Sequence, residues 1–207
     1  MPVLTVNQSP VIGIWKIIEP WQDMLELFQN KAMYINDVLK ILPDKRKCEW
    51  LAIRLLLRHI TGTEMIIGYR TNGSPFLQNS HYNISISHTK GYAALILSSH
   101  SHPGIDIEYR SERALKLCMK YMSEKELDQL KMSSTLATVC WCAKETVFKA
   151  LQESEVDFIK HFHVAPFTLS EQGTLFLKET KTLEQTTYPI YYQVTDKFIL
   201  TWTEGNV

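Results

Sequence analysis

The chain alternates short apolar, β-branched runs with longer helical stretches, and it has neither a glycine-rich phosphate loop nor a regular strand–helix–strand repeat. A parallel sheet is built from such repeats, so their absence favours antiparallel sheets packed with separate helices. The sequence therefore predicts an α+β fold. The runs predicted as strands are 11–18, 64–69, 82–87, 92–98, 104–108, 188–194 and 197–203, and the predicted helices are 21–29, 44–60, 111–122, 123–131 and 134–152.

A polar segment that ends in proline, SSHSHP at 98–103, is the clearest break near the middle of the chain. A length of 207 residues suits one large domain or two small ones that pack together. The connector is too short to let two halves move freely. We therefore expect an N-terminal half at 1–101 and a C-terminal half at 102–207.

The overall charge gives no sign of a polyanionic partner, because 22 Lys and Arg residues balance 22 Asp and Glu residues. Nucleic acid and membrane surfaces are therefore not expected as partners. The N-terminus lacks a basic segment followed by an apolar one, and no apolar run is long enough to span a bilayer. With four cysteines that lack CxxC spacing, these features predict a cytoplasmic protein with free thiols.

The segment GIDIE at 104–108 carries two carboxylates on a predicted strand. Side chains alternate along a strand, so Asp106 and Glu108 point to the same side. Two carboxylates about 7 Å apart repel each other unless a cation lies between them. Oxygen ligands of this kind suit Mg²⁺ together with substrate phosphates. The alternative is an acidic strand face that is simply hydrated.

The predicted helix that contains WCAKETVFKAL at 141–151 carries a second polar set. Trp141, Glu145 and Lys149 are four residues apart and therefore lie on one side of the helix. Glu145 could be a third metal ligand and Lys149 a phosphate contact. An ordinary surface pair between Glu145 and Lys149 is the alternative.

Ser87 and His88 end the predicted strand of NISISH, immediately before a turn at Gly91. That position exposes both side chains at the rim of a sheet. A serine hydrolase would need a glycine-flanked nucleophile, which Ser87 lacks. A surface histidine is the alternative to a ligand contact by His88.

The order SISH, GIDIE and W-x-x-K-E-x-x-x-K resembles the 4′-phosphopantetheinyl transferase superfamily, in particular its long, Sfp-type branch. The resemblance extends from about Asp44 to Leu151. It implies two similar α+β halves related by a pseudo-two-fold axis, with the active site and coenzyme A in the cleft between them. The length of the chain implies a monomer of the long branch, not the trimer of the short branch.

The resemblance also implies the roles of the polar residues. Asp106, Glu108 and Glu145 would hold Mg²⁺, while Glu145, Lys149 and His88 would act in catalysis. The reaction would move the 4′-phosphopantetheine arm of coenzyme A to a serine of an apo acyl or peptidyl carrier protein, with Glu145 accepting the serine proton directly or through water. Adenosine 3′,5′-bisphosphate would leave. The residues expected to bind coenzyme A are Lys45, Arg46, Arg54, Arg70, Gly73, Pro75, Ser87, His88 and Lys149.

One position departs from the family pattern. The stretch RTNGSPFL at 70–77 has Ser74 between its glycine and proline, where the family usually has a basic residue. A nucleotide contact would then be missing or supplied by a neighbour such as Arg70.

A basic stripe follows the GIDIE strand. Arg110, Arg113, Lys116 and Lys120 would share one side of the predicted helix 111–122, and Leu115, Cys118, Met119 and Met122 would face the core. The stripe could bind the acidic surface of a carrier protein, or it could be an ordinary hydrated helix face.

Two other functions use the same residues. A metal-dependent phosphoesterase or nuclease would activate water at the same carboxylates and would need no carrier protein. A binding module that had kept the fold without catalysis is the second alternative, against which the complete set of acidic residues and Lys149 speaks.

Overall fold

The computed structural model describes residues 3–8 and 10–205 and divides the chain into two compact units, Met1–Ser99 and His100–Val207. Helices and antiparallel strands occur in both units, which confirms the predicted α+β class. The symmetry between the halves stays a prediction.

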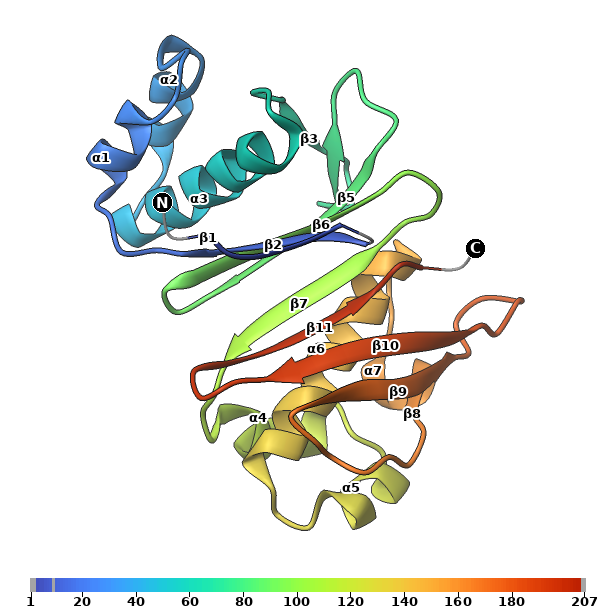
Figure 1. Cartoon of the computed structure of the whole chain (residues 1–207). Helices are drawn as coiled ribbons and strands as arrows, with labels where there is room; N and C mark the ends of the chain where they lie inside the picture. The colour runs from blue at the N-terminus through green and yellow to red at the C-terminus, as the bar shows by residue number, and fades with distance from the viewer. Residues whose placement is uncertain (1–2, 9, 206–207) are drawn as a thin grey trace. The chain divides into compact units, whose positions relative to one another are not determined.

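In the first unit, a long helix covers one face of a four-stranded antiparallel sheet (Figure 1). The helix α3 (Asp44–Thr61) ends at Gly62, whose positive φ of 76° is the left-handed conformation that glycine adopts easily. On the strand below, a Cβ at Gly13 would lie 2.8 Å from the side chains of Leu56 and Ile60. Glycine at this position therefore lets the helix lie close to the sheet. The sheet order is β1 (Val3–Gln8), β2 (Val11–Lys16), β6 (Tyr92–Ser98) and β5 (Asn83–Thr89).

Smaller elements complete this unit. The helices α1 (Trp21–Glu26) and α2 (Ala32–Lys40) pack against α3. A two-stranded hairpin joins β3 (Ile67–Tyr69) to β4 (Pro75–Leu77). The helix α2 was not predicted from the sequence.

The second unit is built around another long helix, α6 (Ser134–Leu151), which packs on a five-stranded antiparallel sheet (Figure 1). Buried apolar side chains of α6 and of the sheet form its core, and the hydroxyls of Thr146 and Thr201 lie 2.6 Å apart within it. The sheet order is β7 (Gly104–Tyr109), β11 (Phe198–Thr203), β10 (Thr187–Val194), β9 (Gln172–Glu179) and β8 (Phe162–Val164). The shorter helices are α4 (Arg113–Leu117), a 3₁₀ turn (Cys118–Lys120), α5 (Glu124–Leu130) and α7 (Phe158–His161).

The prediction of one continuous helix over 111–122 is wrong. The helix α4 has only five residues, and the chain then turns inward to bury Tyr121. The Tyr121 hydroxyl lies 3.0 Å from the carbonyl oxygens of both Ala114 and Ala137, so a tertiary contact overrides the helical pattern. Met119, expected in the core, is 72% exposed.

Candidate active site in the second unit

The polar residues of β7 and α6 meet because a glycine lets the two elements approach closely. A Cβ on Gly104 would lie 2.0 Å from the backbone oxygen of Thr146, a contact that no side chain tolerates. Glycine at the start of GIDIE therefore allows the strand to lie against the helix backbone. Asp106 is two residues further along β7, and Glu145 and Lys149 flank Thr146 on α6.

Lys149 contacts the strand β7 directly. Its ammonium group lies 2.8 Å from Oδ1 of Asp106 and donates a hydrogen bond of 2.9 Å to the carbonyl oxygen of Ile105. Asp106 is 5% exposed, so this pairing occurs largely out of water and is stronger than a surface pair. The structure thus joins the two segments that the sequence pattern singled out.

Trp141 orients the second carboxylate of the strand. Its indole Nε1 donates a hydrogen bond of 3.3 Å to Oε1 of Glu108. Trp141 and Glu145 are one helical turn apart, so one face of α6 carries groups that contact or approach the acidic strand.

Glu145 is held in an environment that disfavours its charge. Burial raises the pKa of its carboxyl group to about 7, with a further contribution from the negative charge of Asp106 and a smaller one from Glu108, while Lys149 acts in the opposite direction. These interactions show that the three carboxylates are electrostatically coupled. A carboxyl group with a pKa near neutrality can accept or release a proton at physiological pH.

The donor chemistry of this acidic site fits a hard cation. Mg²⁺ commonly takes one or two protein carboxylates and completes its shell with water and phosphate oxygens. A cation near Asp106, Glu108 and Glu145 would also relieve their mutual repulsion. Among residues 3–8 and 10–205, however, no group of three or more His, Cys, Asp or Glu side chains is arranged so that it could hold a metal ion. The metal-binding roles of Asp106, Glu108 and Glu145 therefore stay predictions.

A pocket of about 680 Å³ opens beside Glu108. Aromatic walls come from Tyr121, Trp141 and Phe158, and the basic side chains of Arg113 and Lys120 also line it. Apolar walls with a few polar groups are typical of sites for small organic ligands. The sequence did not reveal this pocket, because its walls come from four separate segments of the second unit.

A cationic cluster in the first unit

Three residues expected to bind coenzyme A converge in the first unit. The carboxylate of Glu49 lies 3.1 Å from Arg46 Nη1, 3.5 Å from Lys45 Nζ and 3.2 Å from His88 Nδ1. The Arg46 guanidinium also contacts the imidazole of His88. We call these four residues the cationic cluster. Lys45 and Arg46 are exposed, so they can reach a ligand.

Glu49 is the member of the cationic cluster that sequence reasoning missed. It is 5% exposed and organises the cations around it. The spacing of three and four residues from Arg46 and Lys45 was the available signal, since such pairs meet on one helix face. The participation of His88, 39 positions further along the chain, could only come from the fold.

The hairpin between β3 and β4 contains Arg70, Gly73 and Pro75. The Arg70 guanidinium lies 3.4 Å from the Ser74 hydroxyl and 3.2 Å from the Pro75 carbonyl oxygen. Gly73 has a φ of 82°, a turn conformation that favours glycine. The guanidinium of Arg70 thus lies beside Ser74, and its part in binding the nucleotide stays a prediction.

Two other expected contacts lie within the body of the first unit. The Arg54 guanidinium lies 3.2 Å from the centre of the Trp50 ring and donates to the Trp50 carbonyl oxygen at 3.0 Å. Burial lowers the pKa of Arg54 to about 10. The prediction that Ser87 is exposed at the sheet rim is wrong, because β5 continues to Thr89 and Ser87 is buried within it. Their roles in ligand binding stay predictions, as do those of the other expected site residues.

Comparison with known proteins gives one match. Residues 103–203, just under half of the chain, match the model of the 4′-phosphopantetheinyl transferase superfamily. The matched region extends from the start of β7 to the end of β11 and includes the whole acidic site. No curated protein matches the chain. The similarity supports phosphopantetheine transfer as the general activity, with coenzyme A as the substrate class.

No helix in the described part of the chain is both long and apolar enough to cross a membrane. All four cysteines are free thiols, and Cys140 and Cys142 are buried.

Proposed function

We propose that this protein is a Mg²⁺-dependent 4′-phosphopantetheinyl transferase of the long, Sfp-type branch, which modifies a serine of an apo acyl or peptidyl carrier protein. The observation that carries the proposal is the contact of Lys149 with Asp106, together with the electrostatic effect of Asp106 and Glu108 on Glu145, inside the region that matches the family. The presence of a second compact unit supports the long branch. A monomer in the cytoplasm belongs to the same proposal.

The reaction breaks one phosphorus–oxygen bond and forms another. The carrier serine oxygen attacks the phosphorus that bears the pantetheine, and adenosine 3′,5′-bisphosphate leaves with the bridging oxygen. Glu145 accepts the serine proton directly or through a water molecule. Lys149 contacts Asp106 on β7, and its ammonium group stabilises the negative charge of the diphosphate oxygens.

Asp106, Glu108 and Glu145 would hold the metal ion. When bound, Mg²⁺ would neutralise charge that develops on the leaving phosphate. Trp141 keeps Glu108 oriented through its hydrogen bond, so that less reorganisation is needed when a ligand arrives.

Other parts of coenzyme A have matching surfaces. The pocket beside Glu108 has apolar walls and a volume that suit the pantetheine arm. The cationic cluster in the first unit, with Arg70 and Pro75 of the hairpin, suits the 3′-phosphate and the nucleotide.

The decisive experiment is the intact mass of a purified apo carrier protein after incubation with the enzyme, coenzyme A and Mg²⁺. A gain of one phosphopantetheine supports the proposal, and chelation of Mg²⁺ should abolish the gain. A parallel reaction without carrier protein tests the alternative, since a phosphoesterase would release phosphopantetheine there. Binding of coenzyme A without any gain in carrier mass would indicate a non-catalytic module.

A further inference from the structure

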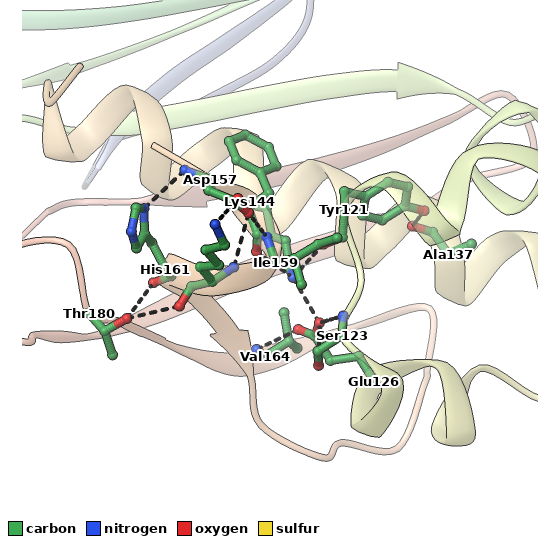
Figure 2. A network of polar contacts seen from close by, with 12 residues as sticks. Tyr121, Ser123, Glu126, Ala137, Lys144, Asp157, Ile159, His161, Val164 and Thr180 are labelled. Atoms are coloured by element: carbon green, nitrogen blue, oxygen red, sulfur yellow. Dashed lines mark hydrogen bonds and ion pairs between the residues drawn. The ribbon is translucent and has the colours of Figure 1, made fainter. Parts of the chain in front are cut away.

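A buried lysine, Lys144, lies one residue before Glu145 and has no place in the reaction described above. Its side chain is 0% exposed, and its ammonium group donates to Glu126 Oε2 at 2.8 Å, to the Tyr121 carbonyl oxygen at 2.7 Å and to the Phe158 carbonyl oxygen at 3.1 Å. All three donor positions of the ammonium group are thus used. Figure 2 shows Lys144 within this network.

Glu126 is bound equally completely. Its Oε2 accepts from the Ser123 backbone at 2.7 Å and from the Ser123 hydroxyl at 3.0 Å, and its Oε1 accepts from the Val164 backbone at 2.9 Å (Figure 2). The pair therefore joins α6 to the start of α5 and to β8.

Stability alone does not account for a charged pair in this core. Burial lowers the pKa of Lys144, against the opposing effect of Glu126, which reflects the cost of removing the ammonium group from water. Apolar pairs of similar volume are often as stabilising as a buried ion pair or more so. What an apolar pair cannot do is hold two backbone carbonyl groups in fixed positions.

Those two carbonyl groups belong to residues that form the pocket walls. The Tyr121 and Phe158 side chains line the pocket beside Glu108. Their rings pack against Trp141 with centroid distances of 5.0 Å and 5.7 Å. Trp141 in turn donates to Glu108. The hydrogen bonds of Lys144 thus fix the backbone of the two aromatic residues whose rings contact the ring of Trp141.

We propose that Lys144 is a positioning residue that fixes the aromatic walls of this pocket and thereby sets the affinity for the pantetheine arm without touching it. The inference rests on the proposed function, in which the arm occupies the pocket. The hydrogen bonds from Lys144 to the two carbonyl oxygens do the positioning, and Glu126 compensates the buried charge of the lysine.

The test separates positioning from stability. Lys144→Met would leave the Glu126 carboxylate buried without its cation and should lower the melting temperature strongly. The double variant Lys144→Met with Glu126→Leu removes both charges and should recover most of that loss. Glu126→Gln keeps the lysine and its two carbonyl contacts. Leu175→Ala, in the same core but on β9, serves as a control for a general loss of stability.

The measurement is calorimetric binding of coenzyme A and of adenosine 3′,5′-bisphosphate, which lacks the arm. The ratio of the two affinities reports the contribution of the arm. In the double variant this ratio should fall about tenfold, since displaced walls lose their fit to the ligand, while binding of the bisphosphate stays within about twofold. The ratio should hold in Glu126→Gln and in Leu175→Ala.

An unchanged ratio in the double variant would overturn the inference, and so would an equal loss in Leu175→Ala. A wild-type ratio of one would also overturn it, because the arm would then gain nothing from the pocket. Failure of the proposed function would look different. A wild-type protein that binds coenzyme A in its pocket but leaves the carrier unmodified would contradict the transferase activity. It would not contradict the role of Lys144.

Discussion

Both units pack a long helix on an antiparallel sheet, but the charged side chains that cluster in them have opposite sign. Each lays an 18-residue helix on an antiparallel sheet. In the first, one carboxylate, Glu49, lies among the basic groups of Lys45, Arg46 and His88. In the second, the ammonium group of Lys149 lies at an acidic strand, and burial together with the charges of Asp106 and Glu108 raises the pKa of Glu145.

The same arrangement, a helix on an antiparallel sheet, therefore carries basic side chains in one unit and acidic side chains in the other. The balance of the whole chain, 22 basic against 22 acidic residues, conceals this segregation. A substrate with a terminal phosphate monoester and a metal-bound diphosphate requires both signs. If the comparison is right, changes in the second unit should affect chemistry, and changes in the first should affect nucleotide affinity.

The largest effect is expected at Asp106. Asp106→Asn keeps an oxygen for Lys149 and removes the negative charge, so transfer to the carrier should fall by at least about 100-fold. The rise in melting temperature that Mg²⁺ confers should also disappear. Carrier mass and thermal melts with and without Mg²⁺ measure both effects. Near-normal turnover would remove Asp106 from the metal site.

Glu145 should make the metal-free protein lose stability as pH rises. Because its pKa is raised to about 7 from an ordinary value of 4.5, the native state binds the proton more tightly than the unfolded state does. The stabilising contribution of the neutral group is complete below pH 4.5 and is lost as pH rises through 7.

Glu145→Gln should therefore have a flatter melting curve against pH than the wild type between pH 4.5 and 7 in a chelating buffer. Other titrating groups affect both proteins and cancel in the comparison. Parallel curves would mean that neither burial nor the charges of Asp106 and Glu108 raise the pKa of Glu145 in the folded protein.

In the first unit, Arg46→Gln should weaken coenzyme A binding by about tenfold, the value of a hydrogen bond to a charged group. The effect should be much smaller with 3′-dephospho-coenzyme A. Turnover at saturating coenzyme A should hold, unlike in Asp106→Asn. Lys197→Gln, an exposed position in the second unit, is the matched control. Equal weakening with both nucleotides would place Arg46 away from the 3′-phosphate.

Local patterns predicted the elements that carry the chemistry. The alternation in GIDIE and the four-residue spacing of Trp141, Glu145 and Lys149 gave a strand and a helix that the structure contains. The closeness of the two was not local information, since it depends on Gly104 lying against the backbone of Thr146. The resemblance to a known family supplied that step.

Tertiary contacts explain what sequence reasoning missed. Lys144 is the first lysine of the W-x-x-K-E-x-x-x-K pattern, but the pattern gave it no role, because Glu126 and the carbonyl groups of Tyr121 and Phe158 come from other segments. The helix expected at 111–122 fails for the same reason, since burial of Tyr121 outweighs the helical pattern. Periodicity describes one element at a time, whereas these residues are defined by contacts between elements.

Because the helix expected at 111–122 is broken, only part of the predicted basic stripe lies on one helix. Arg110 lies before α4, where its guanidinium contacts Thr135 and the Thr195 carbonyl oxygen, while Arg113 and Lys116 remain exposed on the short helix. Reversing both charges with glutamate should raise the Michaelis constant for the carrier severalfold and flatten its salt dependence. Because Arg113 also lines the pocket beside Glu108, the single variant Lys116→Glu is the one that should leave the Michaelis constant for coenzyme A unchanged.

Glutamate at Lys178 and Lys197, two exposed positions of the same unit, is the matched control for the charge reversal. If the control variant impairs the carrier equally, net charge and not a docking surface sets the rate.

The smallest effect is expected at Ser74, where the first unit departs from the family pattern. Ser74→Lys would add a cation beside Arg70 in the hairpin, and it would keep the backbone hydrogen bond of 3.0 Å to Asn72 that shapes the turn. An exposed charge contributes little, so coenzyme A binding should tighten only about twofold. The gain should shrink with 3′-dephospho-coenzyme A and with added salt.

Replacement of Ser74 also removes its hydroxyl contact of 2.7 Å with Asn72, and Ser74→Met isolates that loss because its side chain is long and uncharged. Calorimetric binding to both variants and to Arg70→Gln measures the separate contributions. If the lysine and methionine variants bind equally, the phosphate lies out of reach of position 74. Ser74→Lys can be combined with Arg70→Gln in one chain. If the affinity lost in Arg70→Gln is then restored, one cation at this turn is enough. Arg70 would then fill the role of the missing basic residue.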